Sequence, residues 1–466
     1  MRTFLVAADL VILLYLLFIN FFYAMLLARS MAHLKHQTRL AEDSDFRRLV
    51  WSDSLPPVSV LVPAHNESAT IEASVTGLLH LEYRLCEIVV VNDGSTDDTM
   101  ERLRRAFDLF EIPRIYPHVL PTRPLRGIYR SRWHPRLVVV DKENGGKADA
   151  LNAAINASRF PWVMPVDADM LLERQALLRL TRPFSLGRES IAALGGSIGV
   201  ANDCTVVEGR VVTVRLPRRP LPALQVVEYL RAFLYGRLGW SAYRSNILIS
   251  GAVGLFRKTY LMAVGGYATS HLTEDLDVVV RLHRYLRERR IAYEMPFISD
   301  PIAWTEVPES PEGLARQRGR WQRGLLLTMW DSRRMFFSLR YGRIGLVTLP
   351  FYAFGEGFAP VVESLGYGLT LLGLWLGAVD RDFMLLFFCC SFGFGMMLSL
   401  FAIVLEERHQ RLYRKASDLL RLVCLAALES IVYRPMTVWW RLRAFLTLWR
   451  DTRTWGESVR RGFSAG

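Results

Sequence analysis

Two carboxylates separated by one alanine, Asp167 and Asp169, follow the apolar run VMPV at residues 163–166. Residues at positions i and i+2 of a strand project from the same side, so the two side chains can share a divalent cation or face a diphosphate. Asp-x-Asp also occurs by chance where a strand ends in a solvated turn. The pair is therefore a candidate binding site only if the surrounding sequence agrees.

Further polar residues follow other apolar runs or open a helical pattern. Asp93 follows EIVVVN within NDGS, and Lys147 ends the Gly-rich turn after LVVVDKEN. Glu274 and Asp275 lie in TED, where a segment with helical spacing begins. Acids at a helix N-terminus are also ordinary capping residues, so this last pair has a purely structural explanation as well.

A basic cluster with one tryptophan, QRGRW, occupies about two turns of a predicted helix at residues 314–330. Its polar and aromatic members are Gln317, Arg318, Arg320 and Trp321. By composition alone the segment also fits a basic amphipathic helix at a membrane surface, with Trp321 at the lipid interface.

The elements that must position these residues alternate between strands and helices. Apolar strand-like runs lie at 58–66, 87–95, 137–147 and 162–169, and segments with helical spacing follow the first three. This alternation predicts an α/β fold with a mostly parallel sheet, and such sheets bind ligands beyond the carboxyl ends of their strands. Asp93, Lys147, Asp167 and Asp169 all fall at such ends.

The pattern is weaker elsewhere. Residues 116–136 are rich in Pro and Arg and indicate a loop, as does the basic stretch 209–224. A helix is predicted at 224–240. The segment 250–258 begins with Ser250 and Gly251, small residues that suit close backbone approach by a ligand.

Composition points to a membrane protein with a basic part. The chain has 466 residues, of which 51% are hydrophobic, and a net charge of +13. The charge fits a positive-inside bias, an anionic substrate, or both. Five scattered cysteines give neither a disulfide framework nor metal-ligand spacing. Nothing resembles a nucleic-acid-binding module, so no nucleic-acid partner is expected.

Residues 4–28 form an apolar run long enough to cross a membrane. A signal peptide is the competing interpretation, but the run is too long, lacks an early basic region and has no convincing cleavage site. Basic residues follow it, which predicts that the next domain faces the cytosol. Later, 344–379 indicates a kinked helix and 383–405 a second span, whereas 419–449 fits either a short hairpin or interfacial helices.

Taken in order, NDGS, GGK, DAD, TED and QRGRW resemble the motifs of the processive family 2 glycosyltransferases, such as the bacterial poly-N-acetylglucosamine, cellulose, chitin and hyaluronan synthases. The resemblance covers about residues 58–330 and is far more specific than any single motif. It implies a GT-A-like (Rossmann-like) cytosolic domain inserted between transmembrane and interfacial helices.

On the donor side, the resemblance implies that Asp93 and Lys147 bind a UDP-sugar. Asp167 and Asp169 look like the pair that holds the sugar-diphosphate with Mg²⁺ or Mn²⁺. The remaining donor-side residues, which would neutralise the departing UDP, are Arg320, Gln317 and Arg318.

On the acceptor side, Asp275, with Glu274 beside it, resembles the general base of an inverting displacement. Trp321 would stack on the acceptor sugar, and Ser250 and Gly251 match a small-residue loop beside it. In the C-terminal segment, Trp455 and Gly456 resemble a switch loop of hyaluronan synthases, although the following Glu and Ser depart from that pattern. A lipid-bound amphipathic tail explains this segment equally well.

The expected organisation is an N-terminal transmembrane helix (1–30), a cytosolic linker (31–55), the glycosyltransferase domain (56–332), interfacial and transmembrane helices (333–450) and a basic tail (451–466). The expected protein is a multi-pass plasma-membrane enzyme that polymerises a UDP-sugar, first UDP-N-acetylglucosamine, onto a growing polysaccharide. A β-glucan synthase, a non-processive transferase to a lipid carrier, and a transporter or scaffold with an inactive domain are the alternatives. A homo-oligomer or an export partner is compatible with the few membrane segments.

Overall fold

The computed structural model describes residues 2–42, 54–113, 117–207, 209–377 and 381–448. They form two compact units. The sheet unit lies within His36–Arg215 and Arg244–Val307, and the helical unit within Met1–Lys35, Leu216–Tyr243 and Pro308–Ser458. The domain boundaries expected from the sequence stay a prediction.

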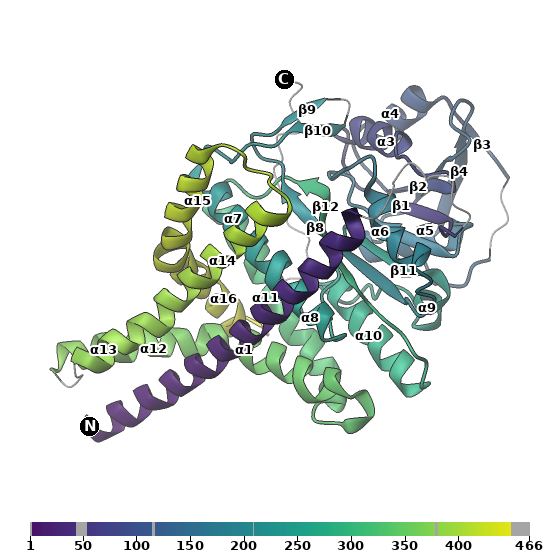
Figure 1. The fold of residues 1–466 in the computed structure, drawn as a ribbon. Coiled ribbons are helices and arrows are strands. Elements are labelled where there is room, and N and C mark those ends of the chain that lie inside the picture. The colour runs from purple at the N-terminus through teal and green to yellow at the C-terminus, as the bar shows by residue number, and fades with distance from the viewer. Residues whose placement is uncertain (1, 43–53, 114–116, 208, 378–380, 449–466) are drawn as a thin grey trace. The chain divides into compact units, whose positions relative to one another are not determined.

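The sheet unit is built on ten strands in the order β3-β4-β5-β2-β1-β6-β11-β8-β12-β7 (Figure 1). The strands are β1 Val58–Ala64, β2 Cys86–Asp93, β3 Leu109–Glu111, β4 Leu125–Ser131, β5 Leu137–Lys142, β6 Trp162–Pro165, β7 Leu171–Leu172, β8 Ala193–Val200, β11 Gly254–Arg257 and β12 Phe297–Thr305. The helices are α3 Ile71–Leu79, α4 Thr99–Phe107, α5 Lys147–Ala157, α6 Ala176–Ser185, α9 Lys258–Ala263 and α10 Glu274–Glu288. A separate hairpin pairs β9 Thr205–Val207 with β10 Arg210–Thr213.

The centre of the sheet, β5-β2-β1-β6, is parallel throughout, and its strands are almost completely buried. Burial on both faces explains why these strands are continuous apolar runs instead of alternating ones. Strands β4, β11 and β7 each pair antiparallel with a neighbour. The predicted α/β fold is confirmed, and the predicted strands of this centre are present.

Two predicted loops were wrong. Within 116–136, β4 pairs with β5, and Ile128 and Tyr129 are buried there. The Pro- and Arg-rich flanks obscured a strand whose β-branched and aromatic residues find a partner only in the folded sheet. Within 209–224, β10 forms a hairpin and a helix begins at Pro220, a residue type favoured in the first helical turn.

The helical unit contains α1 Arg2–Glu42, whose last residues belong to the sheet unit, α7 Pro220–Arg231, η1 Ala232–Arg237, α8 Leu238–Ala242, α11 Pro311–Asp331, η2 Arg333–Met335, η3 Leu339–Tyr341, η4 Ile344–Thr348, η5 Phe351–Gly357, α12 Ala359–Trp375, α13 Arg381–Phe388, η6 Cys389–Gly393, α14 Phe394–His409, α15 Ala416–Leu428, η7 Glu429–Tyr433 and α16 Arg434–Leu446. The helix predicted at 224–240 is present. Residues 416–446 form one continuous helical run, so the alternative of a short hairpin there does not apply.

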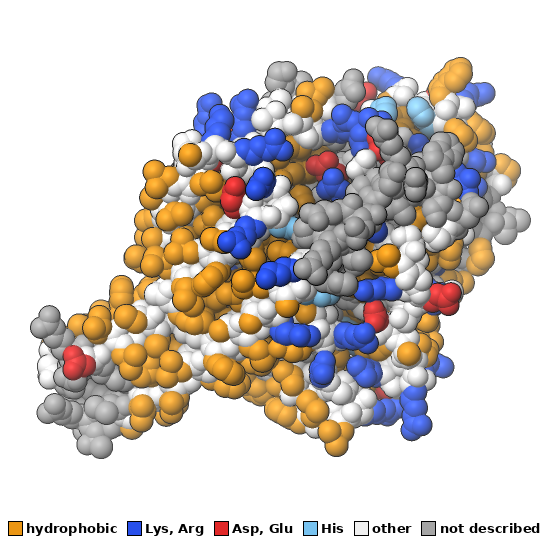
Figure 2. Space-filling model, viewed as in Figure 1, with side chains coloured by type: hydrophobic (Ala, Val, Ile, Leu, Met, Phe, Trp, Pro, Cys, Tyr) orange, Lys and Arg blue, Asp and Glu red, His pale blue; other side chains and the backbone are white. Residues whose placement is uncertain are grey.

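Two helical segments are long and apolar enough to cross a membrane, Leu10–Lys35 and Met384–His409. The pair Ile344–Gly357 and Ala359–Trp375 passes the same criteria together and is bent by 40°. Pro360 lies just after the bend, in keeping with the predicted kink. Hydrophobic side chains dominate the surface over α12 and α13 in Figure 2, and Leu371, Trp375 and Leu385 are among the exposed ones.

His283 on α10 is a buried histidine of the sheet unit with a hydrogen-bond partner for each ring nitrogen. The ring is buried; Nε2–H donates to the Asn246 carbonyl (2.9 Å), and Nδ1 accepts from the Tyr293 hydroxyl (2.7 Å), which together use both nitrogens of a neutral imidazole. Burial, aided by Arg287, lowers its pKa from 6.5 to about 4.

We predict that the stability of the sheet unit falls as the pH drops from about 6.5 to about 4. In this window His283 is protonated in the unfolded chain but stays neutral in the folded chain. Acid therefore lowers the free energy of unfolding, by up to about 3 kcal/mol. Thermal unfolding of the detergent-solubilised chain across this range measures the effect. A His283→Gln variant should show a flatter dependence, and an equally steep one would contradict the assignment.

Candidate active site

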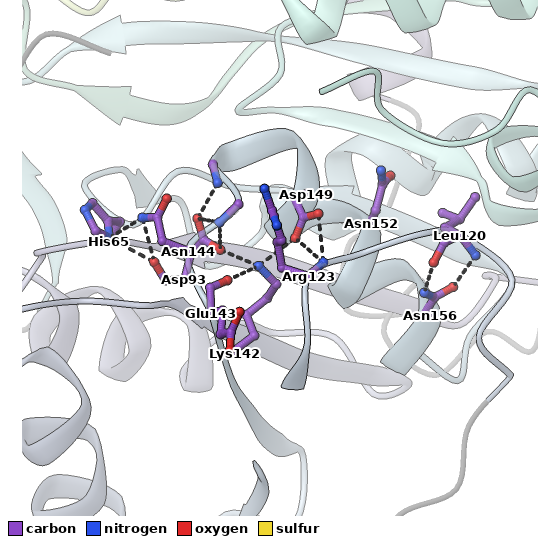
Figure 3. A network of polar contacts seen from close by, with 12 residues as sticks. His65, Asp93, Leu120, Arg123, Lys142, Glu143, Asn144, Asp149, Asn152 and Asn156 are labelled. Carbon is purple, nitrogen blue, oxygen red and sulfur yellow. Dashed lines mark hydrogen bonds and ion pairs between the residues drawn. The ribbon is translucent and has the colours of Figure 1, made fainter. Parts of the chain in front are cut away.

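A buried ion cluster links the carboxyl ends of β2 and β5 to α5 (Figure 3). Asp93 and Lys142 are register partners at the ends of these strands, and Lys142 Nζ lies 2.6 Å from Asp93 Oδ1. The same Nζ lies 2.6 Å from Asp149 Oδ1 on α5. The lysine is fully buried between two carboxylates, so each charge has a partner.

The Asp93 carboxylate also shapes the Gly-rich turn before α5. It accepts hydrogen bonds from the backbone nitrogens of Gly145 (3.0 Å) and Gly146 (2.7 Å). Gly146 has φ +86°, a left-handed conformation that glycine adopts readily. Because Lys147 is the next residue and the first of α5, the buried Asp93 fixes the turn that presents Lys147.

Lys147 joins a second cluster, of charged groups from three parts of the sheet unit. Its Nζ lies 2.5 Å from Asp167 Oδ1 and 3.3 Å from Glu274 Oε1. Burial acts to lower the pKa of Lys147, but Asp167 and Glu274 outweigh it and hold that pKa above its usual value. Burial raises the pKa of Glu274, against the opposing effect of Lys147. The structure thus gathers three of the predicted site residues.

Asp275 adjoins this cluster at the start of α10 and is oriented by backbone donors. Its Oδ2 accepts from Gly251 N (3.1 Å) and its Oδ1 from Leu276 N (2.8 Å). The small-residue turn that contains Ser250 and Gly251 therefore lies against Asp275, the predicted general base. A Cβ at position 251 would come within 2.9 Å of Asp275 Cβ, which explains the need for glycine.

We predict that Gly251→Ala lowers turnover about 10-fold or more, because the added methyl must displace Asp275, and small displacements of reacting groups are costly. UDP binding should be nearly unchanged. The measurement is steady-state kinetics alongside UDP affinity. Gly368→Ala is the matched control, since a Cβ there meets open space. Wild-type turnover in Gly251→Ala would contradict this account of the turn.

The two carboxylates of DAD follow β6 in a tight turn, in which Met170 N donates to the Asp167 carbonyl (3.0 Å). The Asp167 side chain is 32% exposed, and Asp169 is buried. Among the described residues, no group of three or more His, Cys, Asp or Glu side chains is arranged to hold a metal. Two carboxylates completed by phosphate oxygens of a substrate are, however, a usual site for Mg²⁺, so the donor set fits such an ion.

The QRGRW residues lie on α11, in the helical unit. Arg318 is buried and pairs with Glu228 on α7 at 2.6 Å, whereas Trp321 is 40% exposed. The predicted donor roles of Gln317, Arg318 and Arg320 and the acceptor role of Trp321 stay predictions, as do those of Asp93 and Ser250. Trp455 and Gly456 lie outside the described residues.

Sequence reasoning assigned no role to Lys142, which it grouped only with the polar residues 141–147, and it missed Asp149. The sequence does indicate that Lys142 needs a partner. A lysine in a strand as apolar as LVVVDK must either point into solvent or form an ion pair with an acid, because an unpaired buried charge is costly. Its register partner Asp93 supplies one acid. Asp149 lies in the first turn of α5, where an acid also fits the helix dipole, so its part in the cluster depends on the fold.

Two family models overlap on this region. "Glycosyl transferase family 2" matches residues 59–195, and "Glycosyltransferase like family 2" matches residues 130–324. Together the two models match residues 59–324 to family 2 glycosyltransferases. This region contains both charge clusters and the QRGRW residues, so the motifs noted in the sequence lie within the part that the family models match.

Curated relatives include two staphylococcal enzymes. The chain is 31% identical over 277 residues to poly-beta-1,6-N-acetyl-D-glucosamine synthase of Staphylococcus aureus (strain COL), which covers 58% of this chain and 55% of that one. It is 29% identical over 322 residues to the synthase of the same name from Staphylococcus epidermidis, covering 66% of each. The chain thus spans about half to two thirds of the length of these relatives.

Solved structures that match the chain include the mannosyltransferase PcManGT from Pyrobaculum calidifontis, with 19% identity, a TM-score of 0.47 and coverage of 92% of this chain and 99% of that one. Staphylococcus aureus TarS 1-349 follows with 14% identity, a TM-score of 0.38 and coverage of 81% and 91%. Both TM-scores are below 0.5, so the GT-A-like fold assignment rests on the sheet topology and the family match.

Proposed function

We propose that this chain is a membrane-embedded, inverting, processive glycosyltransferase that polymerises a UDP-sugar into a β-linked polysaccharide, with UDP-N-acetylglucosamine as the preferred donor. The observation that carries the proposal is the cluster of Lys147, Asp167, Glu274 and Asp275, with Gly251 against the last of them, inside the family 2 region. The names of the staphylococcal relatives support the choice of sugar and of a polymer product.

On the donor side, Lys147 supplies a positive charge for the diphosphate. It pairs with Asp167, and we expect the donor phosphates to compete for its ammonium group. Asp167 and Asp169 would hold Mg²⁺ or Mn²⁺, which when bound would neutralise charge on the departing UDP. Asp93 holds the backbone of the GGK turn from which Lys147 projects.

On the acceptor side, Asp275 acts as general base. It takes the proton from an acceptor hydroxyl while that oxygen bonds to C1 of the sugar and the bond from C1 to UDP breaks. Attack from the face opposite UDP converts an α-linked donor into a β-linked product. The hydrogen bonds from Gly251 N and Leu276 N hold the carboxylate in one orientation for this step.

We infer a plasma-membrane location, with more than one crossing and the sheet unit in the cytosol. The two candidate spans and the basic residues that follow the first of them support this topology. There it would meet cytosolic UDP-sugars and pass a growing chain to the membrane. Export through its own helices, a homo-oligomer and a partner subunit are versions of this proposal, and the mass of the detergent-solubilised complex separates the single chain from the assemblies.

Two rival enzyme functions are a UDP-glucose-dependent β-glucan synthase and a non-processive transferase to a lipid carrier. The relatives' names favour a polymer of N-acetylglucosamine over both. A scaffold with an inactive domain is disfavoured, because the acids and lysine of the site are intact.

A donor panel tests the proposal. Membranes that contain the chain are incubated with labelled UDP-N-acetylglucosamine, UDP-glucose or UDP-glucuronate, with Mg²⁺, Mn²⁺ or a chelator. We expect incorporation into large products from UDP-N-acetylglucosamine only, and its loss with the chelator. Polymer from UDP-glucose alone would support the glucan synthase, and single-sugar products that extract into organic solvent would support the lipid-carrier transferase.

A further inference from the structure

Arg318 of the QRGRW segment is tied to two other helical segments of the helical unit. Its Nη2 lies 2.6 Å from Glu228 Oε2 on α7 and donates to the Tyr433 hydroxyl on η7 at 3.2 Å. Tyr433 in turn donates to the same Glu228 oxygen at 2.6 Å. The three side chains form a closed triangle of hydrogen bonds, so the position of the guanidinium is set from two sides.

The guanidinium of Arg318 also lies over the ring of Trp321, one helical turn further along α11. Its central carbon is 4.4 Å from the ring centroid, within the range of a cation–π contact. Residues three apart on a helix share a face, which brings the two side chains together. Trp321 is nevertheless 40% exposed, so one side of the ring is held by the protein while another part reaches the surface.

The triangle is well suited to keep its charge in place. The Arg318 side chain is only 5% exposed and that of Glu228 24% exposed. Burial acts to lower the pKa of Arg318, but Glu228 outweighs it, and the guanidinium stays charged. A buried ion pair that loses one partner leaves the other uncompensated, so loss of Glu228 would release Arg318 from its position over the ring.

We propose that Glu228 and Tyr433 are positioning residues for acceptor binding: they hold Arg318, and Arg318 holds the Trp321 ring in the orientation in which its exposed part stacks on a sugar. This inference rests on the proposed function and refines it. It gives Arg318 an anchoring role in place of the donor-binding role expected from the motif. An aromatic platform that is already fixed avoids the cost of ordering its side chain when the sugar binds.

The test measures binding without turnover, in full-length chains that carry Asp275→Asn. The probes are a β-1,6-linked N-acetylglucosamine pentasaccharide and UDP, each titrated by calorimetry. We expect Glu228→Ala to weaken pentasaccharide binding about 10-fold, the cost of ordering one or two side chains, and UDP binding to change less than about twofold. Glu228→Gln, which keeps an acceptor oxygen for Arg318, should recover part of the loss, and Tyr433→Phe should cost about threefold.

Coupling to Trp321 separates positioning from general damage. Trp321→Ala should weaken the pentasaccharide as much as Glu228→Ala does, and the double variant should be no weaker than Trp321→Ala alone. Glu363→Gln is the matched control, because Glu363 forms an ion pair with Arg434 that joins α12 to α16 instead of contacting α11. This control should bind the pentasaccharide like the parent.

Unchanged pentasaccharide binding in Glu228→Ala, or additive losses in the double variant, would overturn the inference. A loss of UDP binding as large as the loss of pentasaccharide binding would also overturn it, and would support the donor-binding role that the motif predicts for Arg318. Failure of the proposed function can be distinguished from failure of the positioning role alone. In that case the wild-type chain transfers no sugar and the parent binds no pentasaccharide, and both the function and the positioning role are rejected.

Discussion

Asp275→Asn is expected to lower sugar transfer by about 10²- to 10⁴-fold, the usual contribution of a general base. Asparagine is nearly isosteric with aspartate and can still accept a hydrogen bond from Gly251 N, so the turn between 250 and 252 should keep its shape. What is lost is the capacity to take the proton from the acceptor hydroxyl. The measurement is initial rate with the preferred donor, together with UDP affinity, which should change little.

Glu274→Gln provides the comparison for that result. Glu274 is adjacent in sequence but pairs with Lys147 instead of the Gly251 turn, so its replacement should affect donor binding more than the proton transfer. If Asp275→Asn turned over at the wild-type rate, Asp275 would be removed from the mechanism. A loss confined to Glu274→Gln would move the base to that neighbour.

Lys142→Met is expected to destabilise the sheet unit by about 3–5 kcal/mol, the cost of leaving buried charges without their partner. Lys142 is fully buried, and without its ammonium group Asp93 and Asp149 would face each other with no cation between them. The thermal unfolding midpoint of the detergent-solubilised chain reports the loss.

Lys147→Met is the matched variant for this prediction. Lys147 is partly exposed and its main partner Asp167 is about one third exposed, so solvent can compensate for the lost charge. We expect Lys147→Met to lose activity with little loss of stability, and Lys142→Met to lose both. Equal midpoints for the two variants would contradict the distinction between a structural and a donor-facing lysine.

The parallel centre of the sheet could be predicted because a strand that is buried on both faces needs apolar residues at consecutive positions. Runs such as EIVVV and LVVVD show this pattern. The other strands, among which β8 pairs parallel with β12 and antiparallel with β11, could not be predicted. Strand β8, ALGGSIGV, contains three glycines and has a weak strand signal. The structure supplies the reason for two of them: a Cβ at Gly196 or Gly199 would collide with the side chains of Ile302 or Trp304 on β12. Such a requirement is visible only once the strands are paired.

The candidate site also has a part that could be predicted from the sequence and a part that could not. Lys147 and Asp167 could be nominated because each follows a strand of a parallel sheet, where such sheets bind ligands. Glu274 and Asp275 could be nominated because the TED motif resembles that of the family 2 glycosyltransferases. The side chains that these residues and Arg318 contact could not be predicted from the sequence. Arg318 looked like a phosphate ligand from its motif, and only the packing of α7 and η7 against α11 shows its guanidinium engaged by Glu228 and Tyr433.

The most direct test of the central claim is the product that the purified chain makes from UDP-N-acetylglucosamine, sized on a gel and examined by NMR for anomeric configuration. The account predicts β-linked chains of many sugars that appear while most of the donor is still unused, as expected when one enzyme molecule extends one chain repeatedly. An α-linked product, or transfer that stops after a single sugar, would contradict it.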